Sequence, residues 1–532
     1  MEARQEVAKV LDDIIRHDTI GRIWRQDYTV WKSEPAEISD RLGWLTITDL
    51  MMERVPALQS FAREIRKSAF RQVVLLGMGG SSLGARVLQD VLGSATGYPE
   101  LTVVDTTIPE SVRAVASAVN PAETLFLVSS KSGTTREPFS LWRYFREQVA
   151  AVSDEAGQSF IAITDPETPL ARLAEKEGFR ACFLNPPNIG GRYSVLSYFG
   201  LVPAALMGVD ILLLLERADS MRQRCAATVP APENPGAYLG AFLGTLARQG
   251  RDKLTLVTSP ALTSFGLWVE QLIAESTGKE GKGIVPVNGE PLVAPEYYGS
   301  DRLFVYLRLK SYANSELDER IGLIESSGQP VITLDMRDRY DLGAEFFRWE
   351  FATAVAGTIL GVNPFNQPDV QGAKDATERL LSEYKVSGCL PESQTERGLT
   401  DWLIGARAPQ YLAIMAYLHQ TPEVDGAIAE LRQKVTETCR IATTFGYGPR
   451  LLHSTGQLHK GGPDSGLFLQ ITASHQQDVA VPGEPYTFGV LADAQALGDL
   501  RALQSLGRRV VRVNLGQDHA AGIADLSRRL LP

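Results

Sequence analysis

The chain has very little cysteine. Its 532 residues include only Cys182, Cys225, Cys389 and Cys439, which lie far apart and form no Cys-x-x-Cys pair. This pattern indicates neither a zinc site nor a disulfide framework. Such cysteine usage favours a reducing, cytoplasmic environment.

Long apolar segments are also missing. The longest, residues 201–215, contains Pro203 and Asp210 and is shorter than a membrane span requires. The first 18 residues form an amphipathic, charged pattern that has no apolar signal core. We therefore expect a cytoplasmic protein with no membrane partner.

The chain has no excess of positive charge. Lys and Arg number 53 against 63 Asp and Glu, which gives a net charge of −10. General nucleic-acid binding needs a basic field, so we do not expect it here. A small anionic substrate is still compatible with this charge, because a few local cations can hold a phosphate.

Histidine is scarce as well. After His17 no histidine occurs until His419, so any catalytic histidine is expected in the C-terminal part. His453 and His459 lie together in the polar, glycine-rich segment 453–466. A lone histidine is usually a surface or core residue, but two in such a loop keep a catalytic role open.

What the sequence does contain is a repeated alternation of apolar strands and helices. The first group of expected strands covers residues 72–77, 101–105, 124–130 and 159–165, and the second covers 252–260, 302–309 and 330–336. A long apolar helix is expected at 344–360, and three further strands at 411–418, 467–473 and 510–515. Strands of this kind, interleaved with helices, predict parallel sheets covered on both faces.

From this alternation we predict an α/β protein with two three-layer α/β/α sandwich domains and a C-terminal α/β extension. The expected divisions are a helical lead-in at 1–45, a first domain at 46–220, a second at 221–390 and a C-terminal segment at 391–532. The last boundary rests on the polar, turn-rich segment 382–398. The C-terminal segment is expected to complete the second domain, with a separate unit as the alternative.

Two turns that follow strands are candidates for phosphate binding. Residues 77–84 place Gly80 and Ser81 between a strand and a helix, where backbone N–H groups and the helix dipole favour an anion. Ser82 stands where a dinucleotide fingerprint requires glycine. Residues 129–138 gather five hydroxyl groups and one ammonium at a helix start; the predicted phosphate ligands there are Ser130, Lys131, Ser132 and Thr135. The alternative for these hydroxyls is ordinary helix capping.

Three other stretches carry residues suited to acid–base chemistry. Arg192 follows a glycine pair and can reach a developing oxyanion. Glu275 is expected to enter a turn directly after an apolar helix in residues 266–283, with Lys279 and Lys282 nearby at the mouth of an anion site. The alternative is a solvated glutamate at a helix end. Residues 363–374 form a loop-to-helix segment that ends on Lys374.

Taken together, these stretches resemble the glucose-6-phosphate isomerase family of the sugar-isomerase (SIS) superfamily, over about residues 45–470. The turns at 77–84 and 129–138 are similar to the family's phosphate-binding turns, and residues 190–197 to its arginine motif. Glu275 then takes the place of the catalytic glutamate. Gln367 and Lys374 match the glutamine and lysine of the C-terminal signature. The tail also resembles the isomerase part of bacterial transaldolase–isomerase fusions, whose transaldolase activity we do not carry over.

One departure concerns the catalytic histidine, which in the family's usual order lies between the glutamate and the lysine. No histidine occurs between Glu275 and Lys374. The family's His-x-x-x-Gln-Leu pattern instead begins at His453, and His459 fits the next histidine of the motif. The resemblance implies a homodimer in which this histidine crosses between subunits. We expect that His453 serves its own subunit here.

The activity implied is the reversible isomerisation of glucose 6-phosphate and fructose 6-phosphate through ring opening and a cis-enediol, with no metal or redox cofactor. Glu275 would shuttle the proton, Arg192 would stabilise the oxyanion, and His453 and Lys374 would open the ring. Two alternatives remain. One is a non-catalytic sugar-phosphate sensor, which has no need of Glu275, Arg192 and Lys374 together. The other is an isomerase that acts on arabinose 5-phosphate or accepts mannose 6-phosphate.

Overall fold

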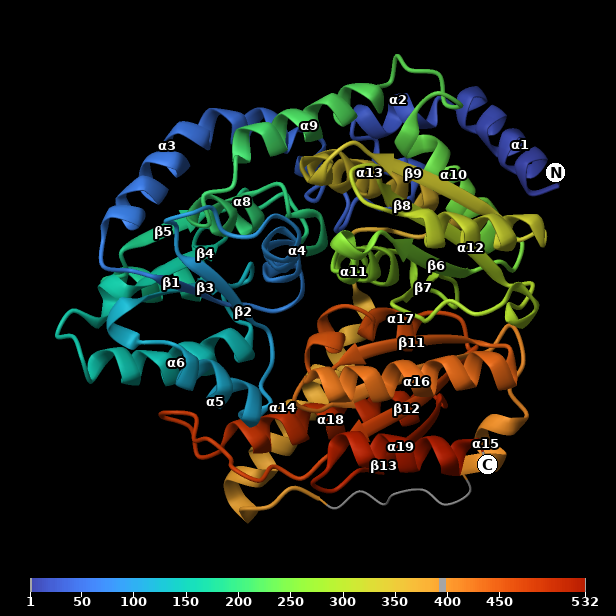
Figure 1. Cartoon of the computed structure of the whole chain (residues 1–532). Helices are drawn as coiled ribbons and strands as arrows, with labels where there is room; N and C mark the ends of the chain where they lie inside the picture. Colours follow the sequence, from blue (N-terminus) through green and yellow to red (C-terminus); the bar gives the residue numbers. More distant parts are fainter. Residues whose placement is uncertain (1, 392–398, 532) are drawn as a thin grey trace.

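The computed structural model describes residues 2–391 and 399–531. They form an α/β protein with three separate sheets, and every strand pair within a sheet is parallel. Figure 1 shows the first sheet on the left, the second at the upper right and the third below the second. The predicted α/β class and parallel sheets are confirmed. No helix in the described ranges is both long and apolar enough to cross a membrane.

The first sheet has the strand order β2-β1-β3-β4-β5. Leu75 and Leu127 point to one face, covered by α3, α4 and α8, and Val74 and Phe126 point to the other, covered by α5, α6 and α7. Burial on both faces explains the continuous apolar strand sequences. The strands are β1 (Gln72–Leu76), β2 (Glu100–Val104), β3 (Thr124–Ser129), β4 (Phe160–Thr164) and β5 (Ala181–Leu184). The helices are α3 (Ile47–Lys67), α4 (Leu83–Leu92), α5 (Pro109–Ala118), α6 (Arg136–Ala150), α7 (Pro169–Lys176) and α8 (Tyr198–Leu206).

The second sheet has the order β7-β6-β8-β9. The helices α10 and α13 pack against each other in the large core that also holds Leu254 and Val305 of this sheet. The strands are β6 (Lys253–Thr258), β7 (Val285–Asn288), β8 (Arg302–Leu309) and β9 (Val331–Met336). The helices are α9 (Ile211–Arg224), α10 (Pro235–Arg248), α11 (Phe265–Thr277), α12 (Ser315–Ser326) and α13 (Leu342–Leu360), with the lead-in helices α1 (Glu2–Arg16) and α2 (Thr19–Trp24).

The third sheet, of order β11-β10-β12-β13, lies wholly within the C-terminal segment. Ile414 and Leu412 face α16 and α19, whereas Ala413 and Met415 face α14 and α18. The strands are β10 (Tyr411–Tyr417), β11 (Ala442–Tyr447), β12 (Gly466–Thr472) and β13 (Arg509–Asn514). The helices are α14 (Gln371–Ser387), α15 (Leu399–Ile404), α16 (Pro422–Cys439), α17 (Gly456–Gly461), α18 (Phe488–Ser505) and α19 (His519–Leu530).

The C-terminal strands therefore form a sheet of their own and do not join the second sheet. The edge strands β7 and β11 contact each other without pairing. Between them the buried carboxylate of Glu290 accepts hydrogen bonds from the Thr443 backbone N–H at 2.7 Å and from its hydroxyl at 2.9 Å. Glu290 is itself paired with Arg302 at 2.8 Å, so a polar network occupies the place where a strand pair would form. The proposed domain boundaries stay a prediction.

The polar segment expected at 382–398 is only partly as predicted. The helix α14 continues through Ser387 and ends at Gly388, which takes the left-handed conformation with φ 73°. Glycine adopts this conformation without a steric cost, which makes it a common helix stop. Residues 392–398 lie outside the described part of the chain.

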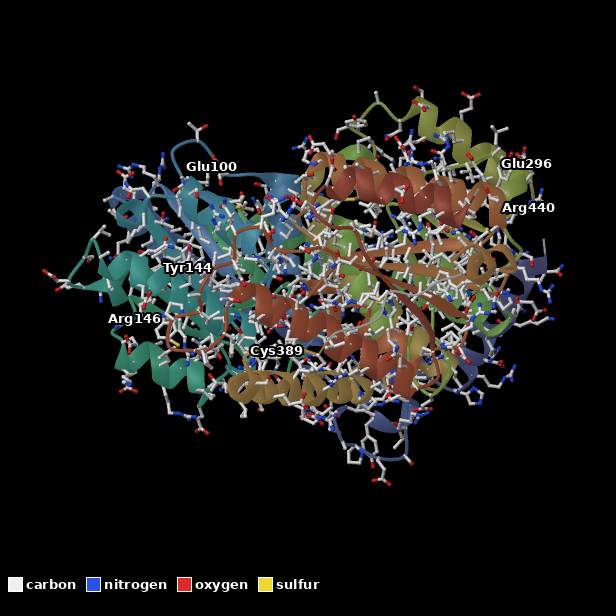
Figure 2. All side chains as sticks on the ribbon, turned by 90° about the horizontal axis from the view of Figure 1, so that it is seen from below. Glu100, Tyr144, Arg146, Glu296, Cys389 and Arg440 are labelled. Atoms are coloured by element: carbon white, nitrogen blue, oxygen red, sulfur yellow. The ribbon has the colours of Figure 1, made fainter. Side chains whose placement is uncertain are left out.

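The C-terminal segment also packs against the first unit. Tyr144 of α6, labelled in the view from below in Figure 2, meets the ring of Phe488 of α18 edge-on, with ring centroids 5.8 Å apart. His475 Nδ1 lies 3.3 Å from Glu110 Oε2 of α5, and its Nε2 lies 3.6 Å from Asp493 Oδ1. The C-terminal segment thus contacts both of the other units.

The His475 contact predicts a pH-dependent contribution to stability. Burial lowers the pKa of His475, but the contacts with Asp493 and Glu110 outweigh burial and raise it to about 10, above its ordinary 6.5. Because the folded-state pKa is raised, the stabilisation is fully present below pH 6.5 and is lost as the pH rises towards 10. Urea unfolding should show the His475→Asn protein destabilised relative to the wild type at pH 6. A difference that did not shrink by pH 10 would contradict this account.

Candidate active site

A cavity of about 540 Å³ lies where the three units meet. It opens beyond the carboxyl ends of β1 and β3, the point of the first sheet where the strand order reverses and where α/β proteins commonly bind ligands. The cavity wall contains ten of the predicted site residues: Gly80, Ser81, Lys131, Ser132, Thr135, Arg192, Glu275, Gln367, Lys374 and His453. Ser130, the remaining one, is not part of the wall.

The turn after β1 approaches two other segments very closely. A Cβ atom on Gly80 would lie 2.2 Å from the carbonyl oxygen of Gly191. One on Gly79, whose φ is +53°, would lie 2.7 Å from the carbonyl oxygen of His453. Only glycine permits such contacts. These two glycines therefore let the loop of Arg192 and the segment of His453 close around the same cavity.

The turn after β3 presents hydroxyl groups that do not cap the following helix. Thr135 is the N-cap residue of α6, yet its side chain makes no capping hydrogen bond. It accepts a hydrogen bond from the Ser130 hydroxyl at 3.0 Å, and Ser132 and Thr134 share a hydroxyl–hydroxyl contact of 2.9 Å. Ser130 is 1% exposed, so it is better placed to orient the Thr135 hydroxyl than to contact a ligand. The direct phosphate contact expected for Ser130 stays a prediction. Lys131, in the same turn, is paired with Asp165.

Glu275 lies inside α11 rather than in a turn after it. The expectation of a turn is wrong because the Thr277 hydroxyl donates to the Ile273 carbonyl at 2.8 Å and the helix continues through Thr277. Glu275 is only 9% exposed, which excludes the solvated alternative. Its Oε1 lies 3.3 Å from Nη1 of Arg192.

Arg192 is 2% exposed and firmly held. Its Nη1 donates to Gln367 Oε1 at 2.8 Å and its Nε donates to the Ser276 hydroxyl at 2.8 Å. Its Nη2 donates to the backbone carbonyls of Pro364 and Asn366. The guanidinium is thus fixed beside Glu275, and the loop of residues 363–367 is the element that fixes it.

Gln271 was not singled out by the sequence reasoning. Its Nε2 donates to Glu275 Oε2 at 3.1 Å and to the backbone carbonyl of His453 at 2.8 Å. The available signal was spacing, because a residue four positions before Glu275 shares its helix face. Gln271 therefore links the glutamate of the second unit to the histidine of the C-terminal segment.

His453 reaches the cavity from the same chain as Glu275. Its Nε2 lies 2.8 Å from Glu137 Oε1 of α6, and Gln495 Nε2 of α18 donates to the same oxygen at 2.7 Å. Burial alone would raise the pKa of Glu137, but the charge of His453 and the hydrogen bonds lower it below the usual value. The ionised Glu137 is thus suited to orient the imidazole of His453.

His459 is not in the cavity wall. It is 3% exposed, and its ring packs edge-on against Phe468 with centroids 5.1 Å apart. Burial and the charges of Lys460 and Arg508 lower the pKa of His459 to about 3. These features describe a neutral core histidine. Of the two histidines, His453 is therefore the better candidate for the catalytic role.

The lysines divide into two groups. Lys374, in the first turns of α14, is exposed at the cavity wall, and the buried Lys460 lies there paired with Asp499 at 2.5 Å. Lys279 and Lys282, expected at the mouth of the anion site, instead bond to the backbone carbonyls of Asn363 and Leu360. They hold the end of α13 and the loop after it, and this expectation is corrected.

Comparisons with known proteins agree with the motifs. Residues 52–287 match the model of the phosphoglucose isomerase family. This range includes both turns, Arg192 and Glu275 but ends before Gln367, Lys374 and His453. The glucose-6-phosphate isomerase of Lactococcus lactis subsp. cremoris (strain SK11) is 29% identical over 395 residues, covering 65% of this chain and 88% of that protein. The enzyme of the same name from Parabacteroides distasonis is 29% identical over 394 residues, with the same coverage.

Solved structures share the fold. A hypothetical protein from Thermus thermophilus superposes with a TM-score of 0.60 at 23% identity, covering 73% of this chain and 99% of that one. A glucose-6-phosphate isomerase from Chlamydia trachomatis superposes with a TM-score of 0.59 at 18% identity, covering 71% and 86%. The resemblance to glucose-6-phosphate isomerases predicted from the motifs is confirmed.

Proposed function

We propose that this chain, a relative of the glucose-6-phosphate isomerases, is an aldose–ketose isomerase that interconverts glucose 6-phosphate and fructose 6-phosphate. The observation that carries the proposal is one cavity that holds a buried glutamate–arginine pair on one side and a carboxylate-oriented histidine on another. Hydroxyl-bearing turns line the same cavity. A proton-transfer enzyme for a phosphorylated sugar needs these three parts.

The phosphate is held by the turns after β1 and β3. The hydroxyls of Ser81, Ser132 and Thr135 and the backbone N–H groups at the start of α6 supply donors that suit a phosphate dianion. Fixing the phosphate sets the register of the sugar carbons at the other end of the cavity.

Ring opening falls to His453 and Lys374. The C1–O5 bond breaks as one group gives a proton to O5 and another takes the proton of the O1 hydroxyl. A histidine oriented by a carboxylate can exchange a proton in either direction near neutral pH. Glu137 and Gln495 act here as positioning residues.

Isomerisation of the open sugar falls to Glu275. Its carboxylate takes the proton from C2, and the electron pair forms the C1–C2 double bond of a cis-enediol. The negative charge that develops on oxygen is stabilised by Arg192, whose guanidinium is already fixed and needs no reorganisation. Glu275 then returns the proton to C1 while the O2 proton is transferred to O1, so that C2 becomes the carbonyl carbon of the ketose. Gln271 positions the carboxylate.

The proposal includes a cytoplasmic location, where phosphorylated sugars are retained by their charge. It also includes a homodimer, although Glu275 and His453 of a single chain already line one cavity. A non-catalytic sensor is disfavoured, since phosphate recognition alone gives no reason to bury Glu275 beside Arg192. A coupled assay with fructose 6-phosphate, mannose 6-phosphate and arabinose 5-phosphate tests the substrate assignment.

Replacing Ser132 and Thr135 with alanine should raise KM for the phosphosugar at least about tenfold, because each hydroxyl is a donor to a charged group. kcat should change much less, since these residues lie far from the reacting carbons. Steady-state kinetics with Ser153→Ala as the control, a partly exposed hydroxyl just beyond the other end of α6, checks this. An unchanged KM would move the phosphate site elsewhere.

A further inference from the structure

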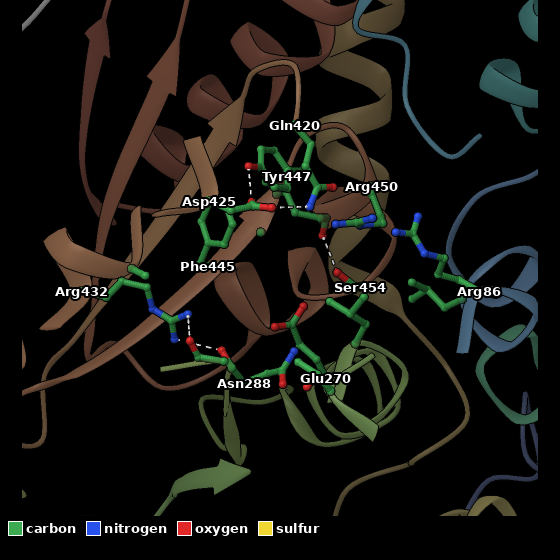
Figure 3. A pocket seen from close by; sticks show the side chains of 17 residues that line it. Arg86, Glu270, Asn288, Gln420, Asp425, Arg432, Phe445, Tyr447, Arg450 and Ser454 are labelled. Atoms are coloured by element: carbon green, nitrogen blue, oxygen red, sulfur yellow. Dashed lines mark hydrogen bonds between the residues drawn. The ribbon is translucent and has the colours of Figure 1, made fainter. Parts of the chain in front are cut away.

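A second cavity, of about 310 Å³, lies on the other side of α11 from the active-site cavity. Figure 3 shows its side chains, which come from all three units. Its polar wall includes Arg86 of α4, Glu270 of α11, Asn288 at the end of β7, Gln420, Arg450 and Ser454. None of these residues has a part in the isomerisation described above.

Glu270 is the unusual member of this wall. Its side chain is buried, the residue being 5% exposed, and within residues 2–391 and 399–531 no hydrogen bond is made to its carboxyl group. In Figure 3 its carboxylate points into the open space of the cavity. Burial raises the pKa of Glu270 to about 7, and the charges of Arg450 and Arg432 offset only part of this effect. Its carboxyl oxygens are therefore open to a donor that enters the cavity.

Two other charged groups of the wall, Asp425 and Arg432, are already held by the chain. Asp425 accepts hydrogen bonds from the Tyr447 hydroxyl at 2.6 Å and from Gln420 Nε2 at 3.0 Å. Arg432 donates to the backbone carbonyls of Asn288 and Gly289, both at 2.9 Å, and to Thr443. Glu270 is thus an acceptor in this wall that a donor from outside the chain, such as a hydroxyl group, can use.

Two arginines, Arg86 and Arg450, lie in the same cavity wall as Glu270. Arg450 contacts Asp105 only at 3.5 Å, longer than a good charged hydrogen bond. Arg86 pairs with Asp90, one turn along α4, through Nε at 2.9 Å, and both arginines also line a smaller adjoining pocket at the end of β2. A ligand in this cavity thus meets two guanidinium groups, each paired with one carboxylate and with further N–H groups that can donate to an anion.

We propose that this cavity is a second binding site, which takes a polyol phosphate with its hydroxyl groups towards Glu270 and its phosphate towards Arg86 and Arg450. The cavity volume suits one such molecule. Its wall carries the hydroxyl acceptor and the cations on different elements, as the two ends of the ligand require.

Two segments lie between the two cavities, and neighbouring residues of each segment face different cavities. Leu451 and Ser454 face the second cavity, whereas Leu452 and His453 between them face the active-site cavity. On α11, Glu270 faces the second cavity and the next residue, Gln271, bonds both Glu275 and the His453 carbonyl. A ligand on Glu270 therefore acts on the segment that places the histidine, and it should change kcat. This step rests on the proposed isomerase function.

Isothermal titration calorimetry with D-glucitol 6-phosphate tests the site without any turnover. The substitutions Ser132→Ala and Thr135→Ala are introduced first, because they weaken phosphate binding in the active-site cavity. In this background we expect one remaining site whose Kd rises at least about tenfold on adding Glu270→Gln or Arg450→Ala. The matched control is Arg63→Ala, the same loss of charge on an exposed face of α3.

Loss of all binding in the starting background would overturn the proposal, as would equal Kd values for Glu270→Gln and the control. If inorganic phosphate binds as tightly as glucitol 6-phosphate, the polyol assignment is wrong. Should Arg450→Ala fail to fold, the isosteric Glu270→Gln decides the outcome. Because none of these results depends on turnover, an inactive protein would refute the isomerase proposal separately.

A kinetic measurement tests the coupling. At saturating sugar phosphate, competition at the active site is relieved, so any effect of glucitol 6-phosphate on kcat reports the second site. We expect kcat to change at least about twofold in the wild type and the response to disappear in Glu270→Gln. A kcat that does not respond would overturn the coupling, and the calorimetry would still judge the binding.

Discussion

Replacing Glu275 with glutamine is expected to slow turnover of glucose 6-phosphate by about a hundredfold or more, the usual size of a lost general base. Glutamine keeps the shape of the side chain but cannot accept the C2 proton. Its single amide oxygen can keep either the hydrogen bond from Gln271 or the contact with Arg192. Binding of the sugar should still change far less than kcat, because the turns after β1 and β3 hold the phosphate.

Two measurements check this expectation. The first is kcat, and the second is exchange of the C2 hydrogen with solvent, which should fall in parallel because the same carboxylate removes it. Glu280→Gln is the matched control, since Glu280 is exposed five residues further on and pairs with Lys32 outside the cavity. Near-normal exchange in the Glu275→Gln protein would transfer the shuttle to another residue.

The strands that were foreseen and those that were missed differ in a physical way. β3 and β10 are buried along their whole length, and a continuous apolar sequence is the mark of such strands. β5 alternates between partly buried and exposed residues at a sheet edge, β7 has only four residues and contains Pro286, and β11 contains two threonines and a glycine. Their strand character comes from neighbouring strands and buried polar partners, which are not properties of the local sequence.

The site shows the same division. Ser132, Arg192 and Glu275 stand in local contexts that carry their own signal: a hydroxyl-rich turn, a glycine pair and an apolar helix. Glu137 and Gln495 lie 358 residues apart and meet only through packing of the C-terminal segment against the first unit. Because this packing is set by tertiary contacts, neither residue was distinguishable in the sequence from an ordinary helix residue.

Replacing His453 with alanine is the second large expected effect. Ring opening should slow by about a hundredfold or more, because the group that exchanges protons with the ring is lost. An open-chain analogue that bypasses this step should lose much less. The comparison of kcat on the cyclic sugar and on the analogue is the measurement, with His459→Asn as a second variant whose buried ring lies outside the cavity. Equal losses on both substrates would remove His453 from ring opening.

The position of His453 also predicts the result of mixing two inactive proteins. Glu275 and His453 of one chain line one cavity, joined through Gln271, so each site is complete without residues of a second chain. Proteins carrying Glu275→Gln and His453→Ala should therefore remain inactive when they are co-expressed and purified together. If the two subunits of a dimer exchanged the histidine, a mixed dimer would have one site that carries both substitutions and one site that carries neither. The second site would be active. Recovered activity in the mixture would show that the histidine acts across subunits and would overturn the single-chain site.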